Sequence, residues 1–312
     1  MRRSRRAATM RGMTIATALT PYLGNVALRP IEPADAAATA RIVFQAFAGV
    51  HDRHRFARDF PTLDAAAQLV DAFVAHPSIH GVVAEIDGRV VGSNFLDARG
   101  PITGVGPITV DPRAQTAGVG RRLMDAVLAL GAEARGIRLL QDAFNTASLA
   151  LYSSLGFAVR EPIALLNGRP RATVAPDVEV RSLRASDLPA AEALALRVLG
   201  FERTAELRDA LEAAPLEPFA VTRAGRITAY ATTLTSFAAA HAVAETAEDM
   251  KALITGAIAA TDAPGAFLLP TRQSELFRWA LASGLRVVKP MTYMTVGEYH
   301  EPDGAWIPSV LY

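Results

Sequence analysis

The stretch from Gln115 to Arg122 has the residue types and the spacing of a site that binds a phosphate group. Gly118 and Gly120 stand at the expected start of a helix, and Arg121 and Arg122 follow directly. The first backbone amides of a helix lack partners within the helix, and with the positive end of the helix dipole they attract an anion. Glycine removes side chains that would block the anion, and arginine adds positive charge. The stretch therefore predicts a cradle for a diphosphate.

Two other phosphate-binding patterns do not fit this sequence. A nucleoside-triphosphate loop requires Gly-Lys-Ser/Thr, which the chain does not contain. A dinucleotide fingerprint requires a third glycine, and after Gly104-Val-Gly106 that position holds Thr109. A strand-to-helix turn whose glycines serve only tight packing stays open as the structural alternative.

The elements around the cradle follow from the apolar pattern. Residues 102–110 are expected to form a strand that ends at Asp111-Pro112, and residues 119–135 a helix with one apolar stripe. The stripe consists of Val119, Leu123, Val127, Leu130 and Ala134. One strand further, residues 146–155 are expected to form a helix that Asn145 caps and Gly156 ends. Tyr152 on this helix has a neutral phenol that could donate a proton to a leaving group.

The chain repeats itself, which predicts two copies of one mixed α/β module. Val26 to Asp35 and Val178 to Asp187 align without a gap, each as a short strand followed by an aspartate at a helix start. Residues 82–92 and 220–229 each read as a hairpin with a glycine turn. A third pair links Leu155-Gly156-Phe157 to Ser283-Gly284-Leu285, where a helix ends on glycine.

On these residues the sequence resembles the GNAT superfamily of acyl-coenzyme A dependent acetyltransferases. Gln115-Thr-Ala-Gly118-Val-Gly120 matches the family's phosphate loop, Gln/Arg-x-x-Gly-x-Gly/Ala, and Asn145, Tyr152 and Leu155-Gly156-Phe157 match its downstream motifs. The resemblance covers about residues 22–165. It implies a splayed mixed sheet, acetyl-coenzyme A as donor and Tyr152 as general acid. The donor-binding residues that it implies are Ile108, Thr109, Val110, Gln115, Thr116, Ala117, Gly118, Val119, Gly120, Arg121, Arg122, Asn145 and Ser148.

The predicted fold class is therefore α/β with a mixed sheet, in two tandem GNAT-type domains. We expect a disordered basic tail over 1–21, a domain with the acetyl-coenzyme A site over 22–166, a linker over 167–177, and a degenerate domain over 178–312. In the second copy the matching loop, Ala242 to Lys251, has no glycine and three acids, which would repel a diphosphate. The position that corresponds to Tyr152 lies near Trp279.

The sequence does not single out the base that would take a proton from an amine acceptor, because residues 102–110 contain no acid. The candidates are Glu85, Asp97, His51, His54 and the carboxylate of Tyr312, at the end of an unusually apolar terminus. The cluster from His51 to Arg55 is interpreted as a solvated helical turn. No metal site is expected, since His76 and His80 flank Pro77 without a second set of ligands.

Composition narrows the function further. The chain has 312 residues, 32 basic and 31 acidic, and no cysteine. It offers no global charge for nucleic acid or membrane and no thiolate chemistry. The prediction is a cytoplasmic enzyme that transfers acetyl from acetyl-coenzyme A to a primary amine of a small molecule or peptide, by direct attack in a ternary complex. A homodimer is left open, and the alternative functions are an acyl-coenzyme A sensor or a non-catalytic assembly module.

Overall fold

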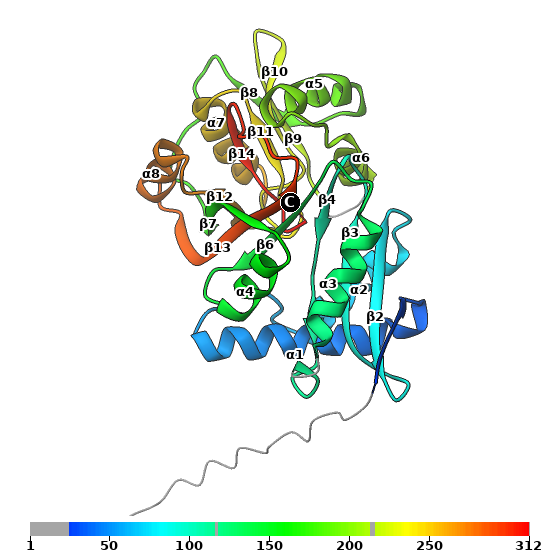
Figure 1. Ribbon diagram of the computed structural model, residues 1–312. Coiled ribbons are helices and arrows are strands. Elements are labelled where there is room, and N and C mark those ends of the chain that lie inside the picture. Colours follow the sequence, from blue (N-terminus) through cyan, green and yellow to red (C-terminus); the bar gives the residue numbers. More distant parts are fainter. Residues whose placement is uncertain (1–24, 116–117, 213–215, 312) are drawn as a thin grey trace, which may run out of the picture.

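The computed structural model describes residues 25–115, 118–212 and 216–311 in two halves that share one large sheet (Figure 1). The predicted tail 1–21, Thr116, Ala117 and Tyr312 lie outside the described residues. Within these ranges no helix combines the length and the apolar character that crossing a bilayer requires.

The first half alternates strands and helices around the phosphate-loop region. Its elements are β1 (Val26–Pro30), the 3-10 helix η1 (Pro33–Asp35), α1 (Ala36–His54), α2 (Leu63–Ala75), β2 (Ile79–Ile86), β3 (Arg89–Asp97), β4 (Ile102–Val105), β5 (Thr109–Val110), α3 (Val119–Leu130), β6 (Gly136–Asp142), α4 (Thr146–Ser154) and β7 (Ala158–Gly168).

The second half repeats this order. Its elements are β8 (Glu179–Ser182), the 3-10 helix η3 (Ala185–Asp187), α5 (Leu188–Leu199), α6 (Thr204–Glu212), β9 (Phe219–Arg223), β10 (Arg226–Ala231), β11 (Ala242–Ala244), α7 (Ala247–Ala259), β12 (Gly265–Pro270), α8 (Ser274–Ala282), β13 (Arg286–Gly297) and β14 (Ala305–Ile307).

The same ion pair begins both halves, which confirms the first repeat at the level of side chains. Arg29 on β1 donates to both carboxylate oxygens of Asp35 at 2.6 and 2.8 Å. Arg181 on β8 donates to both oxygens of Asp187 at 2.7 and 3.0 Å. In each copy the aspartate also accepts the backbone N–H three residues before it. A bidentate arginine–carboxylate pair fixes the angle between strand and following helix.

The two predicted hairpins are present, and each turns on a pair of residues with positive φ. Asp87 and Gly88 have φ of 52° and 71°, and they join β2 to β3. Ala224 and Gly225 have φ of 49° and 75°, and they join β9 to β10. Two successive residues with positive φ define the turn whose twist suits a two-residue hairpin.

The halves exchange one strand each at their junction. The large sheet has the order β1-β2-β3-β4-β6-β13-β7-β12, with β5 paired to β3. The late strand β13 thus lies between β6 and β7 of the first half, antiparallel to both. In return β7 lies between β13 and β12 of the second half. A second sheet, β14-β11-β10-β9-β8, completes the second half.

Helices cover both faces of the first half's sheet. On one face, α3 packs against Val82, Ala84 and Ile86 of β2. On the other face, Phe73 of α2 packs against Ile79 and Phe95. Helix α3 ends at Leu130 and not at Arg135 as predicted, because Gly131 caps it there with hydrogen bonds back to Val127 and Ala129. Leu130, expected in the apolar stripe, is consequently 53% exposed.

The sheet opens beside β4 and β5. The predicted strand over 102–110 is split, because residues 106–108 form a bulge between β4 and β5: β3 pairs Leu96 with Val105 but Ser93 with Thr109. β4 pairs with β6 only as far as Gly104 and Arg138. Beyond that point no strand pairing joins β5 to β6 in the described residues. The separation leaves a cleft between two strands of one sheet.

Candidate active site

The N-terminus of α3 faces outward as an unfilled cradle. Gly118 holds the N-cap position with φ of 70°, a left-handed conformation that favours glycine. A Cβ added to Gly118 would meet no atom within 4 Å, and one on Gly120 would come no closer than 3.6 Å to Leu151. Among the described residues no side chain caps this end of the helix. Within the described residues the first-turn amides of α3 therefore have no side-chain partner, and their binding of an anion stays a prediction.

The other predicted residues of the loop have distinct surroundings. Val119 is fully buried and can offer only its backbone. Arg121 donates to the Ser154 hydroxyl at 2.6 Å, and Arg122 donates to the Val26 carbonyl at 2.8 Å, so both side chains are held at the rim of the cradle. Gln115 is exposed.

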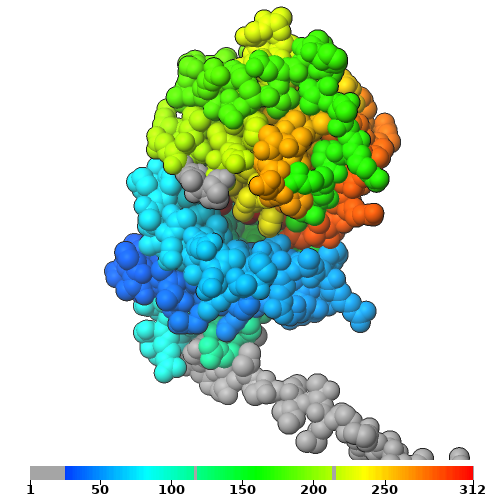
Figure 2. Space-filling model, turned by 180° about the vertical axis from the view of Figure 1, so that it is seen from behind, coloured from blue at the N-terminus to red at the C-terminus, as the bar shows by residue number. Residues whose placement is uncertain are grey.

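The cleft between β5 and β6 continues into a cavity of about 670 Å³ between the two halves. This volume is in the range of small-molecule sites. Its near end is lined by Val105 to Ile108 and by Leu139 to Asp142, the edges of the open sheet. Its far end is lined by α2, by α6 and by the C-terminal residues Ser309 to Leu311. Figure 2 shows a recess at the junction of the halves from behind.

Helix α4 brings three predicted residues to the near end of the cavity, where Asn145, Ser148 and Tyr152 all line it. Asn145 caps α4, since its side-chain oxygen accepts from the Ser148 N–H at 3.3 Å. Ser148 donates to the Asn145 carbonyl at 3.1 Å. Burial, and to a lesser degree the charge of Asp142, raise the pKa of Tyr152, so its phenol keeps its proton at neutral pH. A protonated phenol is compatible with the predicted acid role of Tyr152, which stays a prediction.

The sequence also predicts three donor-binding residues on the strand before the loop: Ile108, Thr109 and Val110. Of these, Ile108 lines the cavity. Thr109 is buried, and its hydroxyl lies 3.2 Å from that of Ser93. Val110 lies beside α3, with a methyl group 3.9 Å from the Cβ position of Gly120. Only Ile108 therefore presents its side chain to the cavity.

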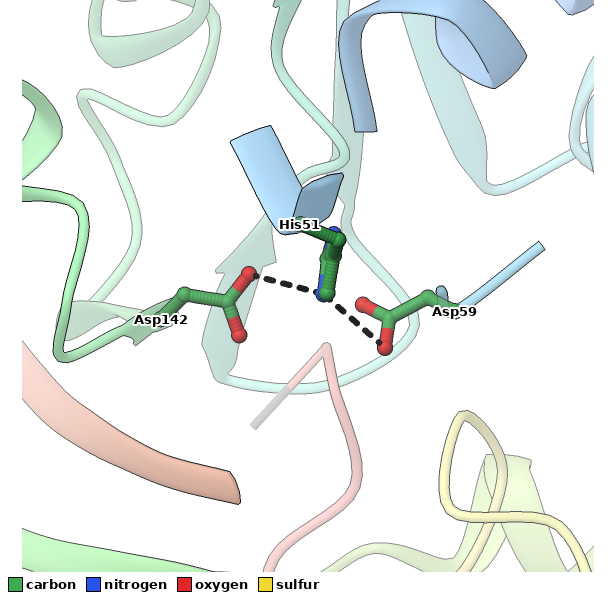
Figure 3. A group of neighbouring side chains, drawn as sticks. All are labelled: His51, Asp59 and Asp142. Atoms are coloured by element: carbon green, nitrogen blue, oxygen red, sulfur yellow. Dashed lines mark ion pairs between the residues drawn. The ribbon is translucent and has the colours of Figure 1, made fainter. Parts of the chain in front are cut away.

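A buried charge cluster forms one wall of the same cavity. His51 lies between the carboxylates of Asp59 and Asp142, with Nε2 at 3.5 and 3.4 Å from their oxygens (Figure 3). The Nζ of Lys289, from β13, lies 2.7 Å from both oxygens of Asp59 and 2.6 Å from Oδ1 of Asp142. His51, Asp59 and Asp142 are the ligand types of a metal site, but the cation that they surround is this ammonium.

The cluster shifts the pKa values of its two aspartates in opposite directions. Burial opposes ionisation of Asp59, but His51 and Lys289 outweigh it and hold its pKa below the usual value. For Asp142, burial raises the pKa, Asp59 adds to the effect, and Lys289 does not fully offset it. For His51, burial alone would lower the pKa, but Asp59 more than compensates, so the pKa is raised. Of the two aspartates, Asp142 is thus the one that more readily takes up a proton.

Three of the proton acceptors considered from the sequence, Glu85, Asp97 and His54, are not among the residues that line the cavity, and the Tyr312 carboxylate lies outside the described residues. Glu85 accepts from Arg29 at 2.6 Å, and Asp97 is held by Arg99. His54 is exposed, as the interpretation of 51–55 as a solvated turn requires, but His51 is fully buried, which corrects that interpretation at one position. Its Nδ1 bonds the Phe47 carbonyl at 2.8 Å, which turns the ring inward.

Asp59, Asp142 and Lys289 are not among the site residues that the sequence predicts. The only local signal for Asp142 is an acid at the end of the strand before α4. Lys289 lies 147 positions further along the chain (289 − 142), and its approach depends on the strand exchange.

The second half has no equivalent of the cradle or of the cleft among its described residues. At the N-terminus of α7 the Thr246 hydroxyl accepts the Asp249 N–H at 3.1 Å, and Arg223 pairs with the Asp249 carboxylate at 2.7 Å. Strand β14 pairs with β11 on one side, and the Gln273 side chain bonds both the N–H and the carbonyl of Trp306 on the other. The gap that is open in the first half is therefore filled by the chain itself.

The helix ends also locate the counterpart of Tyr152. The Phe157 N–H donates to the Tyr152 carbonyl, and the Leu285 N–H donates to the Ala280 carbonyl, both at 3.1 Å. The equivalent residue is thus Ala280, one position beyond Trp279, and it has no proton to donate.

Comparison with solved structures identifies this architecture. A proposed acetyltransferase from Pyrococcus horikoshii superposes with a TM-score of 0.66 at 14% identity, over 91% of this chain and 95% of that one. A tandem GNAT protein from the clavulanic acid biosynthesis pathway gives 0.55 at 12% identity, over 87% and 98%. A GCN5-related N-acetyltransferase from Sphaerobacter thermophilus gives 0.55 at 13%, over 90% and 98%. The chain has the fold of tandem GNAT proteins.

Part of the sequence also matches a family model. Residues 46–157 match the model of the acetyltransferase (GNAT) family. The match lies in the half that carries the uncapped N-terminus of α3. Comparison with curated proteins finds no match.

Proposed function

We propose that this protein transfers the acetyl group of acetyl-coenzyme A to a primary amine held in the cavity between its halves. The proposal depends above all on one observation: the cavity between the halves is lined by the residues directly before β5, and the helix that follows β5, α3, begins without a side-chain cap among the described residues. A diphosphate is compatible with the cradle because a Cβ added to Gly118 would meet no atom within 4 Å among the described residues that are not its chain neighbours. An extended arm fits along β5, where strand pairing is missing.

Each group of the cavity wall then has a chemical task. Acetyl-coenzyme A, when bound, supplies an acyl carbon activated as a thioester. Tyr152 donates a proton to the departing sulfur. Its raised pKa keeps the phenol protonated at neutral pH, so the proton is present to be donated. Asp142 accepts the proton that the amine must lose as the carbon–nitrogen bond forms, because an amine is mostly protonated at neutral pH. Asn145 and Ser148 line the same cavity as these two groups.

The far end of the cavity favours a compact acceptor with an apolar body. Phe60, Phe73 and Phe237 line the cavity, together with four carboxylates, those of Asp59, Asp142, Glu206 and Asp209. Each carboxylate is paired within the protein, Asp59 and Asp142 with Lys289, Glu206 with Arg203, and Asp209 with Arg99. The three phenylalanine rings therefore supply the preference for an apolar body. On this ground we infer an amine with an alkyl or aryl body as the acceptor class.

A direct test measures the release of coenzyme A thiol from acetyl-coenzyme A with a panel of amines and with matched alcohols and amino acids. We expect turnover with apolar amines and none with alcohols. Gly120→Asp, which places a carboxylate in the cradle, serves as the donor-site control. Absence of turnover with every amine, while acetyl-coenzyme A still binds, would instead support the sensor function.

A further inference from the structure

Lys289 is an inaccessible lysine that the second half inserts into the wall of the first half's cavity. It lies on β13, between β6 and β7, and its side chain has no solvent exposure. Its Nζ contacts both oxygens of Asp59 at 2.7 Å, Oδ1 of Asp142 at 2.6 Å and Nε2 of His51 at 3.2 Å. The ring of Phe237 covers it at 5.7 Å. The ammonium thus has three partners: it forms hydrogen bonds with Asp59 and His51, and an ion pair with Asp142, whose Oδ1 has no hydrogen-bond partner among the described residues.

These acceptors come from three separate elements. His51 ends the buried part of α1, Asp59 lies in the segment between α1 and α2, and Asp142 ends β6. Two carboxylates this close repel each other, and without a cation one of them would take up a proton. Lys289 supplies that cation from a strand that belongs to the other half.

A buried ion cluster is a weak means of stabilising a fold, because the desolvation of each charge offsets most of the attraction. Apolar residues of similar size would fill the same volume at least as well. When such a cluster borders a cavity, a role in the function of that site explains its presence better than a contribution to the stability of the core. Two of its members, Asp59 and Asp142, line the cavity, and Lys289 stands behind them.

We propose that Lys289 is a positioning residue for acetyl transfer: it fixes Asp142 on the cavity wall and favours its ionised form, so that the second half completes the active site of the first. This inference rests on the proposed function for its catalytic consequence. The contacts among Lys289, Asp59 and Asp142 do not depend on it.

The first test measures the titration midpoint of the Asp142 carboxyl group and does not require turnover. The ¹³C signals of labelled aspartate carboxyls are followed against pH in the full chain, in Lys289→Met, in Asp59→Asn and in Lys251→Met. Asp142→Asn assigns the signal. Lys251 is a lysine of the same half that pairs with Glu248 and Glu275 on the surface, and it serves as the matched control.

Removing the ammonium should move the Asp142 midpoint upward by about 1–3 pH units, the usual effect of an opposite charge at this distance. Asp59→Asn should move it downward, because it removes a like charge. Lys251→Met should leave it unchanged. An unchanged midpoint in Lys289→Met would overturn the proposal. Should that variant not fold, the downward movement in Asp59→Asn decides in its place, and an unmoved midpoint there would also overturn it.

The second test reads catalysis. The pH at which kcat/KM falls on the acidic side should move together with the titration midpoint of Asp142. At a fixed pH below that fall, a tenfold lower proton affinity of the carboxylate should give a tenfold higher kcat/KM. Lys289→Arg keeps the charge and should keep the pH of that fall. A loss equal at all pH values would show a structural role only. If the native chain acetylates no amine, the proposed function fails, while the carboxyl titration still decides the effect of Lys289.

Discussion

The two aspartates that contact Lys289 should respond to the same substitution with opposite changes in stability. Each is changed to asparagine, which keeps the shape and removes the charge. Asp59 has a pKa below the ordinary 3.8, so its ionised form stabilises the folded state. Asp142 has a pKa above 3.8, so its ionised form is disfavoured there. The comparison is well matched because both carboxylates lie within 2.7 Å of the same nitrogen.

The magnitudes follow from the contacts. Asp59→Asn removes two charged contacts of 2.7 Å and leaves Lys289 with one carboxylate. Breaking a buried pair outright costs about 3–5 kcal/mol, and the remaining Asp142 reduces this to about 2–3 kcal/mol. Asp142→Asn leaves the Lys289–Asp59 pair intact and removes a carboxylate whose burial outweighs its attraction. Its change in unfolding free energy should lie within about 1 kcal/mol of zero or be stabilising, while turnover falls at least 100-fold.

The pH dependence separates the two further. The stability that Asp59 contributes is complete above its unfolded pKa of 3.8 and is lost only as pH falls through its lower folded pKa. The contribution of the Asp59 charge itself is therefore constant from pH 8 to 5. Asp59 also raises the pKa of His51, and the stability of that protonated ring is lost as pH rises through its folded pKa, so the cost of Asp59→Asn should be larger at pH 5 than at pH 8. The cost of ionising Asp142 is complete above its raised folded pKa and disappears as pH falls toward 3.8. Any gain from Asp142→Asn should therefore disappear as pH falls through the raised folded pKa of Asp142 toward 3.8.

The assay is urea unfolding of the native chain and both variants at pH 8, 6.5 and 5, with the slope m compared to confirm equal exposed surface. Equal destabilisation by the two substitutions, or a larger loss for Asp142→Asn, would refute the assignment. It would mean that the ionised Asp142 supports the fold and is not held as a proton acceptor.

Three further outcomes are expected. Gly120→Asp should lower acetyl-coenzyme A affinity at least tenfold by calorimetry while leaving stability intact, since an acid suits the first turn of a helix and the site has room; affinity equal to that of Gly120→Ala would contradict the cradle. Tyr152→Phe should lower turnover about 100-fold with donor affinity nearly unchanged, and equal turnover would remove it from the acid role. Gln273→Ala should cost about 1–3 kcal/mol in urea unfolding, because the N–H and carbonyl of Trp306 lose their partner; an unchanged midpoint would show that β14 is held by β11 alone.

Local features of this fold can be predicted because their causes are local. The hairpin at Asp87-Gly88, the helix end at Gly156 and the open turn at Gly118 each depend on one residue that tolerates positive φ. The repeat is visible because Arg29 and Asp35 keep their spacing in Arg181 and Asp187. Helix α3 ends earlier than predicted, since the apolar period continues past Gly131 although the helix does not.

The charge cluster cannot be predicted from the sequence, because its members are brought together by strand pairing. The alternation of apolar and polar residues predicts a strand but not which strands pair with it. The pattern of β13 shows a strand but not its neighbours, so nothing local places Lys289 beside β6. In the sequence His51 is one member of a polar turn. Only the packing of α1 against the cavity wall separates it from the exposed His54.

The interleaved strands also set the order in which the protein can be made. Synthesis proceeds from the N-terminus, and β6 and β7 emerge long before β13, the strand that must enter between them. Until residues 286–297 leave the ribosome, the facing edges of β6 and β7 have unpaired backbone groups, a state prone to association with other chains. The nascent first half must therefore wait for nearly the whole polypeptide, and a chain released early would lack both its closing strand and Lys289.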